Sequence, residues 1–242
     1  MKLYTVPLAP NPMRVTLYIA EREALGCEFD IERIVVNTLK GRHREPEHLA
    51  RNPWGTLPVL ELDSGQFITE SLVIIDYLEG AVSGPGLLPE QAEHRALSRN
   101  LERIIELRIA QDMGQYVHCQ KSPLGLPQDL PKAQALAQRM QLGFDHIETL
   151  LQDGRQFLEG PSPGVSDCTL GAFLQFMRFS ETDFIGEREA LRGWDRRFPV
   201  FSKKRSVTLE ENSVGTVPQF PRIRCASRLS TRLPLAGPTL NP

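Results

Sequence analysis

The chain has 242 residues, of which 40% are hydrophobic and 24% charged, and its formal net charge at pH 7 is −2. This composition is typical of a globular protein with one large or two small domains, and it excludes collagen-like, coiled-coil and wholly disordered chains. The near balance of charge gives no reason to expect a nucleic-acid or membrane partner. No apolar run approaches the roughly 20 residues of a membrane helix, and prolines interrupt any apolar signal segment at the start. The scattered cysteines show no metal-like spacing, so we expect a cytoplasmic protein with reduced thiols and no metal; they are Cys27, Cys119, Cys168 and Cys225.

The first third of the chain alternates between strand and helix signals. Short β-prone runs cover residues 2–6, 29–36, 57–62 and 66–68. Apolar residues at helical spacing follow the first run and return from Glu70 onward. Because turn residues separate the last two runs, these runs are expected to pair as a hairpin. The order predicts a mixed four-stranded sheet covered by helices.

The rest of the chain is helical in period. Residues 80–89 are rich in Gly and Pro and read as a linker, so we expect one domain over 1–82 and an all-helical bundle over 89–202. Three apolar stripes indicate bundle helices, and a proline-rich loop is expected over Cys119–Pro131. The stripes are Leu97, Leu101, Ile104 and Ile105; Leu136, Met140, Phe144, Ile147 and Leu151; and Leu170, Phe173, Leu174 and Met177.

The strongest local signal is the run NPWGTLPVL over residues 52–60, followed by Glu70-Ser71. If the bond before Pro58 is cis, the Leu57 backbone is turned outward and can pair with an extended ligand as an added strand would. Glu70 and Ser71 open a helix, where a carboxylate, a hydroxyl and unpaired N–H groups suit the two ends of an α-amino acid. The alternative is that Glu70 only favours the helix dipole and Ser71 only caps the helix.

Two motifs resemble the cytosolic glutathione transferases. Residues 52–79, NPWGTLPVLELDSGQFITESLVIIDYLE, are similar to the thioredoxin-like domain of that family. The run Phe157–Gly160, followed by Val165–Leu170, resembles its helical-domain signature, in which an aspartate, here Asp167, caps a buried helix. Gly164 replaces the usual capping residue. The resemblance covers about residues 1–202 and implies a thioredoxin-like domain followed by an all-helical domain.

The resemblance also implies a chemistry. Glutathione would be the co-substrate of a homodimeric enzyme, and its thiolate would attack a small apolar electrophile. By position, the Leu57 backbone before Pro58 would pair with the cysteinyl unit, and Glu70 and Ser71 would hold the γ-glutamyl end. Lys40 and His43 would face the glycine carboxylate.

The sequence departs from the family pattern at the first helix. Many members place a Ser or Cys before a proline there, but this chain has Ala9-Pro10, and alanine donates no hydrogen bond. The run Ala-Pro-Asn resembles a fungal and bacterial subset that uses an asparagine or a bound water near the sulfur, which makes Asn11 a catalytic candidate. The alternative is that Asn11 is a helix N-cap with Pro12 at the first helical position.

A second catalytic candidate is His118. In atypical transferases a His and a Ser from this region can reach the sulfur or its water, and His118 and Ser122 share a helix face if the helix continues. The alternative is a polar histidine at a helix end that interacts with the C-terminal dipole. Cys119 lies beside it, but nothing indicates an activated thiol.

We therefore predict a glutathione transferase active in detoxification. A non-catalytic binding or regulatory protein on the same fold is the alternative, favoured by Ala9 and the basic tail and opposed by the Glu70-Ser71 pair. Isomerase, peroxidase and dehalogenase reactions stay open within the enzyme class.

Residues 203–242 differ in character from the rest of the chain. They contain seven Lys or Arg against two Glu, five Pro and no sustained period. Such a segment buries too little apolar surface to offset its ordering entropy, so we expect a disordered basic tail.

Truncation after Arg205 should therefore leave the melting temperature and glutathione binding unchanged within error. Calorimetry of the full and shortened chains checks this, and a loss of several degrees would mean that the tail packs on the body.

Overall fold

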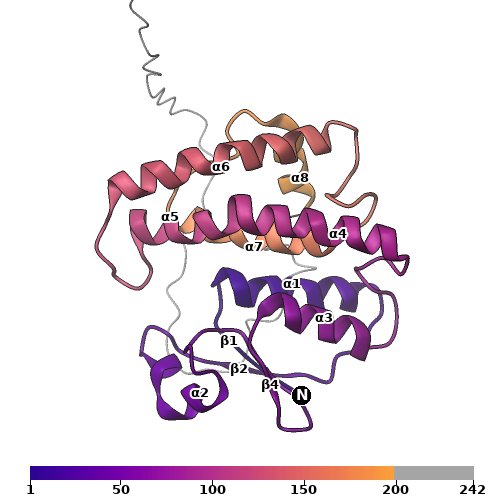
Figure 1. The fold of residues 1–242 in the computed structure, drawn as a ribbon, viewed down its shortest axis with the longest axis vertical. Helices are drawn as coiled ribbons and strands as arrows, with labels where there is room; N and C mark the ends of the chain where they lie inside the picture. Colours follow the sequence, from indigo (N-terminus) through magenta and orange to yellow (C-terminus); the bar gives the residue numbers. More distant parts are fainter. Residues whose placement is uncertain (199–242) are drawn as a thin grey trace, which may run out of the picture. The chain divides into compact units, whose positions relative to one another are not determined.

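The computed structural model describes residues 1–198 (Figure 1). The predicted tail lies outside the described residues. Four strands form one mixed sheet in the order β2-β1-β3-β4. β1 and β2 are parallel, whereas β3 is antiparallel to β1 and to β4, which confirms the expected mixed sheet and its hairpin. The strands are β1 (Lys2–Thr5), β2 (Glu32–Val35), β3 (Val59–Glu61) and β4 (Phe67–Ile68).

Successive side chains of a strand point to opposite faces of the sheet, and both faces of this sheet are buried. Leu3 and Leu60 belong to the main core, whereas the neighbouring Tyr4 and Val59 belong to a second cluster. Helices α1 (Pro10–Ala24) and α3 (Ser71–Ala81) pack against each other on one side of the sheet (Figure 1). Helix α2 (Pro46–Arg51) reaches the second cluster, because the Arg51 guanidinium lies 4.2 Å from the centre of the Tyr4 ring.

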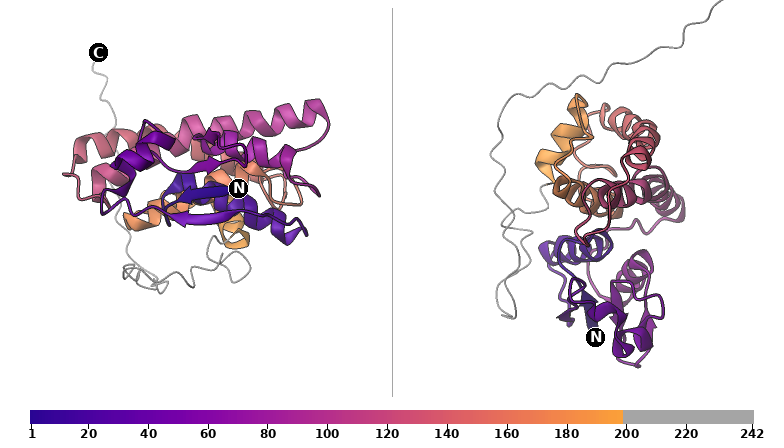
Figure 2. Two further views of the ribbon diagram at one scale, coloured as in Figure 1. Left: turned by 90° about the horizontal axis from the view of Figure 1, so that it is seen from below. Right: turned by 90° about the vertical axis from the view of Figure 1, so that its left-hand side faces the viewer.

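Helices make up the second half of the described chain (Figure 2). They are α4 (Ala92–Ile105), the π turn η2 (Glu106–Ala110), α5 (Gln111–Lys121), α6 (Leu130–Leu151), α7 (Val165–Phe179) and α8 (Glu189–Arg197). Residues 1–198 belong to one compact unit, so the domain limits near residues 82 and 89 stay a prediction. Within these residues no helix combines the length and the apolar character needed to cross a membrane.

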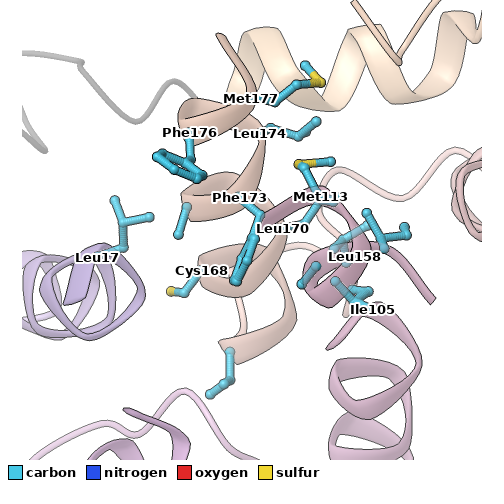
Figure 3. Close-up of a cluster of buried hydrophobic side chains, with 14 of the residues drawn as sticks. Leu17, Ile105, Met113, Leu158, Cys168, Leu170, Phe173, Leu174, Phe176 and Met177 are labelled. Carbon is cyan, nitrogen blue, oxygen red and sulfur yellow. The ribbon is translucent and has the colours of Figure 1, made fainter. Parts of the chain in front are cut away.

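Helix α7 is the centre of the helical half. Every residue from Val165 to Met177 is buried, and α1, α4 and α5 all contact this helix. Figure 3 shows its apolar side chains between Leu17 of α1 and Met113 of α5. The apolar stripes predicted for α6 and α7 are confirmed, because all their members are buried.

The stripe predicted for α4 is partly wrong. Leu97 is 60% exposed, and the buried residues of α4 are Ser98, Glu102 and Ile105. Glu102 turns inward because it accepts hydrogen bonds from Thr169 of α7 and from Arg14 of α1. A polar network therefore decides which face of α4 is buried, and hydrophobic spacing does not reveal it. The expected loop is also shorter than predicted: α5 continues to Lys121, and α6 begins at Leu130.

Asp167 joins three segments of the helical half. It is fully buried, and its carboxylate accepts the backbone N–H groups of Leu158 at 3.0 Å and Gly164 at 2.8 Å. The indole N–H of Trp194 on α8 donates to the same carboxylate. Because Gly164 is the N-cap of α7 and has no side chain, Asp167 supplies the capping contact that this helix start lacks.

Replacing Asp167 by Ala should lower the free energy of unfolding by about 3 kcal/mol or more, because three buried donors lose their acceptor. Urea denaturation measures this. Asp153→Ala is the matched control, since Asp153 is half exposed and, in the described part of the chain, bonds only within its own turn to Arg155. An equal loss in both variants would contradict the assignment.

The pH dependence of the free energy of unfolding is a second test of the role of Asp167. Burial raises the pKa of Asp167 to about 7, although its three donors act in the opposite direction. A carboxyl whose pKa rises on folding contributes stability below its unfolded pKa of ~4, and this contribution is lost as the pH rises through the folded value. The stability of the wild type relative to Asp167→Asn should therefore decline as the pH rises from ~4 to ~7.

Candidate functional site

One end of the sheet collects four of the predicted binding residues. β3 and β4 are antiparallel, and their register, continued beyond the strands, sets Leu57 opposite Ser71 and Pro58 opposite Glu70. β1 runs antiparallel on the other side of β3, so its last residue, Thr5, lies at the same end. These candidates are thus brought together where the chain leaves β1 for α1.

The side chains of Glu70 and Ser71 make no capping hydrogen bond at the helix that these residues open. Glu70 is the N-cap of α3 and Ser71 its first residue, yet no side chain caps this helix. The interpretation of Ser71 as a cap is therefore wrong. Within residues 1–198, neither the Glu70 carboxylate nor the Ser71 hydroxyl has a hydrogen-bond partner. Together with the unpaired N–H groups of the first turn, both groups are available to a ligand.

Leu57 lies just outside the hydrogen-bonded part of the sheet. The Leu57–Pro58 peptide bond is cis, and β3 begins only at Val59. The turn before Leu57 is held by Asn52, a fully buried residue whose amide donates to the Thr56 carbonyl at 3.0 Å and to its hydroxyl at 2.9 Å. A rigid polar turn therefore positions the Leu57 backbone.

Lys40 and His43 differ in the charge that they can offer. Lys40 is exposed, and its ammonium has no partner in the described part of the chain. His43 lies against the turn before Leu57, since its carbonyl would be 3.0 Å from a Cβ placed on Gly55. Burial, aided by Arg44, lowers the pKa of His43, so its ring is mainly neutral at pH 7. A carboxylate here would take its counter-charge from Lys40.

Asn11 is not a helix cap. The N-cap of α1 is Ala9, and Asn11 is the second helical residue, so the capping interpretation is wrong. Its side-chain oxygen instead accepts a hydrogen bond from the Arg14 guanidinium at 3.0 Å. Because arginine only donates, the amide oxygen is turned toward Arg14 and the NH₂ group is left for another acceptor.

Arg14 is the centre of a buried ionic network that sequence reasoning missed. Its side chain is 1% exposed and donates to Glu106 at 2.6 Å and to Glu102 at 3.5 Å. It also lies 5.4 Å from the centre of the Phe173 ring. The only sequence signal was the spacing of three residues from Asn11, because both acidic partners are distant in the chain.

His118 is hydrogen-bonded to Ser122, although α5 ends at Lys121 and Ser122 is its extended C-cap, so the helix does not continue as the shared face required. The distance from Nδ1 to the serine Oγ is 2.9 Å, and the same Oγ accepts the Leu124 N–H at 3.2 Å. Burial lowers the pKa of His118, so the ring is mainly neutral at pH 7. His118 lies in the last turn of α5, where the alternative of a polar histidine near the helix C-terminus placed it, and burial there disfavours the charged ring. With Nδ1 facing Ser122, Nε2 is the nitrogen left for a ligand.

A cleft of about 680 Å³ brings the two catalytic candidates together. It lies between the start of α1 and the helical half, and Asn11 and His118 both line it. Cys119 lines it as well. The other lining residues are Pro10, Glu106, Ala110, Gln111, Gly114, Gln115, Leu126, Pro127, Lys132, Phe173 and Phe176. Among residues 1–198, no three His, Cys, Asp or Glu side chains are grouped so as to hold a metal ion.

A thioredoxin-like domain followed by a helical domain, with a cleft where α1 meets the helices, is the architecture of the glutathione transferases. Comparisons with known proteins agree. Residues 9–81 match the family model of the glutathione S-transferase N-terminal domain. Over 201 residues the chain is 31% identical to glutathione S-transferase 2 of Saccharomyces cerevisiae. The matched region covers 81% of this chain and 84% of the yeast protein. The chain therefore belongs to the glutathione S-transferase family, whose members use glutathione.

Two further similarities extend this result. A solved glutathione S-transferase domain-containing protein from Marinobacter aquaeolei VT8 superposes with a TM-score of 0.75 at 29% identity, covering 85% of this chain and 100% of that chain. Over 107 residues the chain is 34% identical to maleylacetoacetate isomerase of Pseudomonas aeruginosa, covering 43% of this chain and 48% of the isomerase.

Proposed function

We propose that the protein conjugates glutathione to a small apolar electrophile. Glutathione would lie at the end of the sheet on the Leu57 backbone, Glu70 and Ser71, with Lys40 and His43 toward its glycine carboxylate. The electrophile would occupy the cleft. The observation that carries this proposal is the shared cleft, because hydrogen-bond donors from Asn11 and His118 there meet the apolar side chains of the helical half.

Asn11 is the first candidate for activating the thiol. Pro10 and Pro12 have no N–H, and the Met13 N–H donates to the Ala9 carbonyl at 2.9 Å, so within residues 1–198 Asn11 holds the one unpaired backbone N–H of this turn. Asn11 thus offers two donors, its backbone N–H and its NH₂ group. Donors near sulfur stabilise the thiolate and lower a thiol pKa from its ordinary ~8.5. His118 is the second candidate, through Nε2.

A cytoplasmic homodimer that acts in detoxification is part of this proposal, on the strength of the resemblance. Isomerisation of a substrate through its glutathione adduct is a second candidate, supported by the similarity to an isomerase. A binding protein without catalysis is the rival, supported by Ala9. Retention on immobilised glutathione together with turnover of a nitro-activated aryl chloride supports the transferase. Retention without turnover of any electrophile favours the binding protein, and no retention contradicts both.

Replacing Glu70 and Ser71 by Ala should weaken glutathione binding more than tenfold, because a charge-assisted contact is worth roughly 1.5–3 kcal/mol. Calorimetric titration measures the affinity. The double variant Asp63→Ala, Ser64→Ala is the control, since it removes one carboxylate and one hydroxyl at the opposite end of the same hairpin. Equal affinities of the two double variants would contradict the assignment.

Asn11→Asp should slow conjugation at pH 6.5 more than Asn11→Ala does, and it should raise the pKa of bound glutathione. The carboxylate keeps an acceptor for Arg14 but replaces the amide donor with a negative charge beside the sulfur. Rates should partly recover at high pH, where the thiolate forms unaided.

The pH–rate profile of each variant, with His118→Ala in parallel, measures this. If Asn11→Asp leaves the profile unchanged, Asn11 serves only as a partner of Arg14. The activating group is then His118 or the backbone.

A further inference from the structure

The cleft offers an apolar surface to whatever enters beside glutathione. Phe173 and Phe176 line it from α7, and Leu126 and Pro127 line it from the connection between α5 and α6. Burial of an apolar ligand against such groups is favourable but non-directional. These side chains alone would therefore not select among electrophiles of similar shape.

The charges of the cleft are more selective. Among the described lining residues, two carry a formal charge at neutral pH, Glu106 and Lys132. The Glu106 carboxylate accepts from the Arg14 guanidinium at 2.6 Å, so it has an ion-pair partner within the protein, which it shares with Glu102. The Lys132 ammonium has no ion-pair partner in the described chain. Asp129, its nearest acidic neighbour in sequence, caps α6 by accepting the Lys132 backbone N–H at 3.1 Å.

The uncharged polar side chains of the cleft add donors. Gln111, Gln115 and His118 line it together with Lys132. The two amides can donate through their NH₂ groups. Ser122 accepts from Leu124 and can still donate its own hydrogen to His118 Nδ1, which leaves the hydrogen of the neutral ring on Nε2. An anionic group would therefore find a cation and neutral donors here, and no carboxylate without an ion-pair partner among the described lining residues.

We infer that the preferred electrophile is an apolar molecule that carries an anionic group such as a carboxylate, and that Lys132 is the residue that selects it. This inference rests on the proposed conjugation. The apolar body would pack on the phenylalanines, and the charged group would lie toward the start of α6. Lys132 then determines specificity and takes no part in the attack on carbon.

A matched pair of aryl chlorides tests the inference. Each is activated by two nitro groups and carries either a carboxylate or an uncharged carboxamide opposite the chlorine. In both, the glutathione sulfur forms a bond to the ring carbon, chloride leaves with the bonding pair, and the thiol proton passes to solvent. The ratio of kcat/KM for the carboxylate to kcat/KM for the amide, divided by the same ratio for the uncatalysed reaction with glutathione, reports the charge preference, because the amide withdraws more electron density from the ring.

The wild type should favour the carboxylate, and Lys132→Gln should lower the ratio about three- to tenfold. Lys132→Glu should lower it further, and Lys132→Arg should largely preserve it. Lys121→Gln is the matched control, because it removes an exposed lysine of α5 that pairs with Glu181 outside the cleft. A ratio near one in the wild type, or an equal fall in the control, would overturn the inference.

Binding separates this inference from the proposed reaction. The corresponding dinitrobenzoate and dinitrobenzamide, which lack the chlorine, cannot be conjugated by chloride displacement. Calorimetry should show tighter binding of the benzoate to the wild type and loss of that difference in Lys132→Gln. If turnover is absent but this difference is present, the proposed conjugation fails and the anion site stands. If the benzoate shows no advantage, the anion site fails.

Discussion

The buried guanidinium of Arg14 is the interaction on which the site depends. It belongs to α1, and its carboxylate partners, Glu102 and Glu106, belong to α4 and η2. A charge removed from water is tolerated only when its partners are complete, so α1 and the α4–η2 segment cannot separate without exposing or orphaning it. The same guanidinium holds the Asn11 amide oxygen. One buried guanidinium thus joins the two halves of the molecule and orients the candidate donor in the cleft.

The local parts of the fold and site could be predicted from sequence, because their determinants are neighbours in the chain. Alternation and turn residues indicate the hairpin, whereas the register that sets Leu57 opposite Ser71 comes from the structure. The Arg14 contact to Glu106 spans 92 positions and has no periodic signal. The predicted burial of Leu97 is wrong for a related reason. Hydrophobic spacing assigns Leu97 to the core, but the residue of α4 that is hydrogen-bonded to α1 and α7 is Glu102. Hydrophobic patterns therefore predict the elements but not the polar contacts between them.

The cleft combines two kinds of structural support. On the side of α1, proline residues and the Arg14 contact restrict the donors to one residue, Asn11. On the side of α5, His118 is held by a serine that also accepts from the following connection, so the ring orientation depends on how the chain leaves the helix. The first support is ionic and buried, whereas the second is neutral and local. The geometry around a bound sulfur would therefore be fixed more firmly from α1.

The π turn η2 has a consequence for the alignment of related chains. α4, η2 and α5 are continuous from Ala92 to Lys121, and the π turn adds a residue to one helical turn in the middle of this rod. Each residue turns an α-helix by about 100°. In a homologue with one residue fewer in this turn, every later residue of the helix, including the one equivalent to His118, would be rotated to a different helix face. Insertions and deletions there would change which side chains reach the cleft while leaving both flanking helices intact.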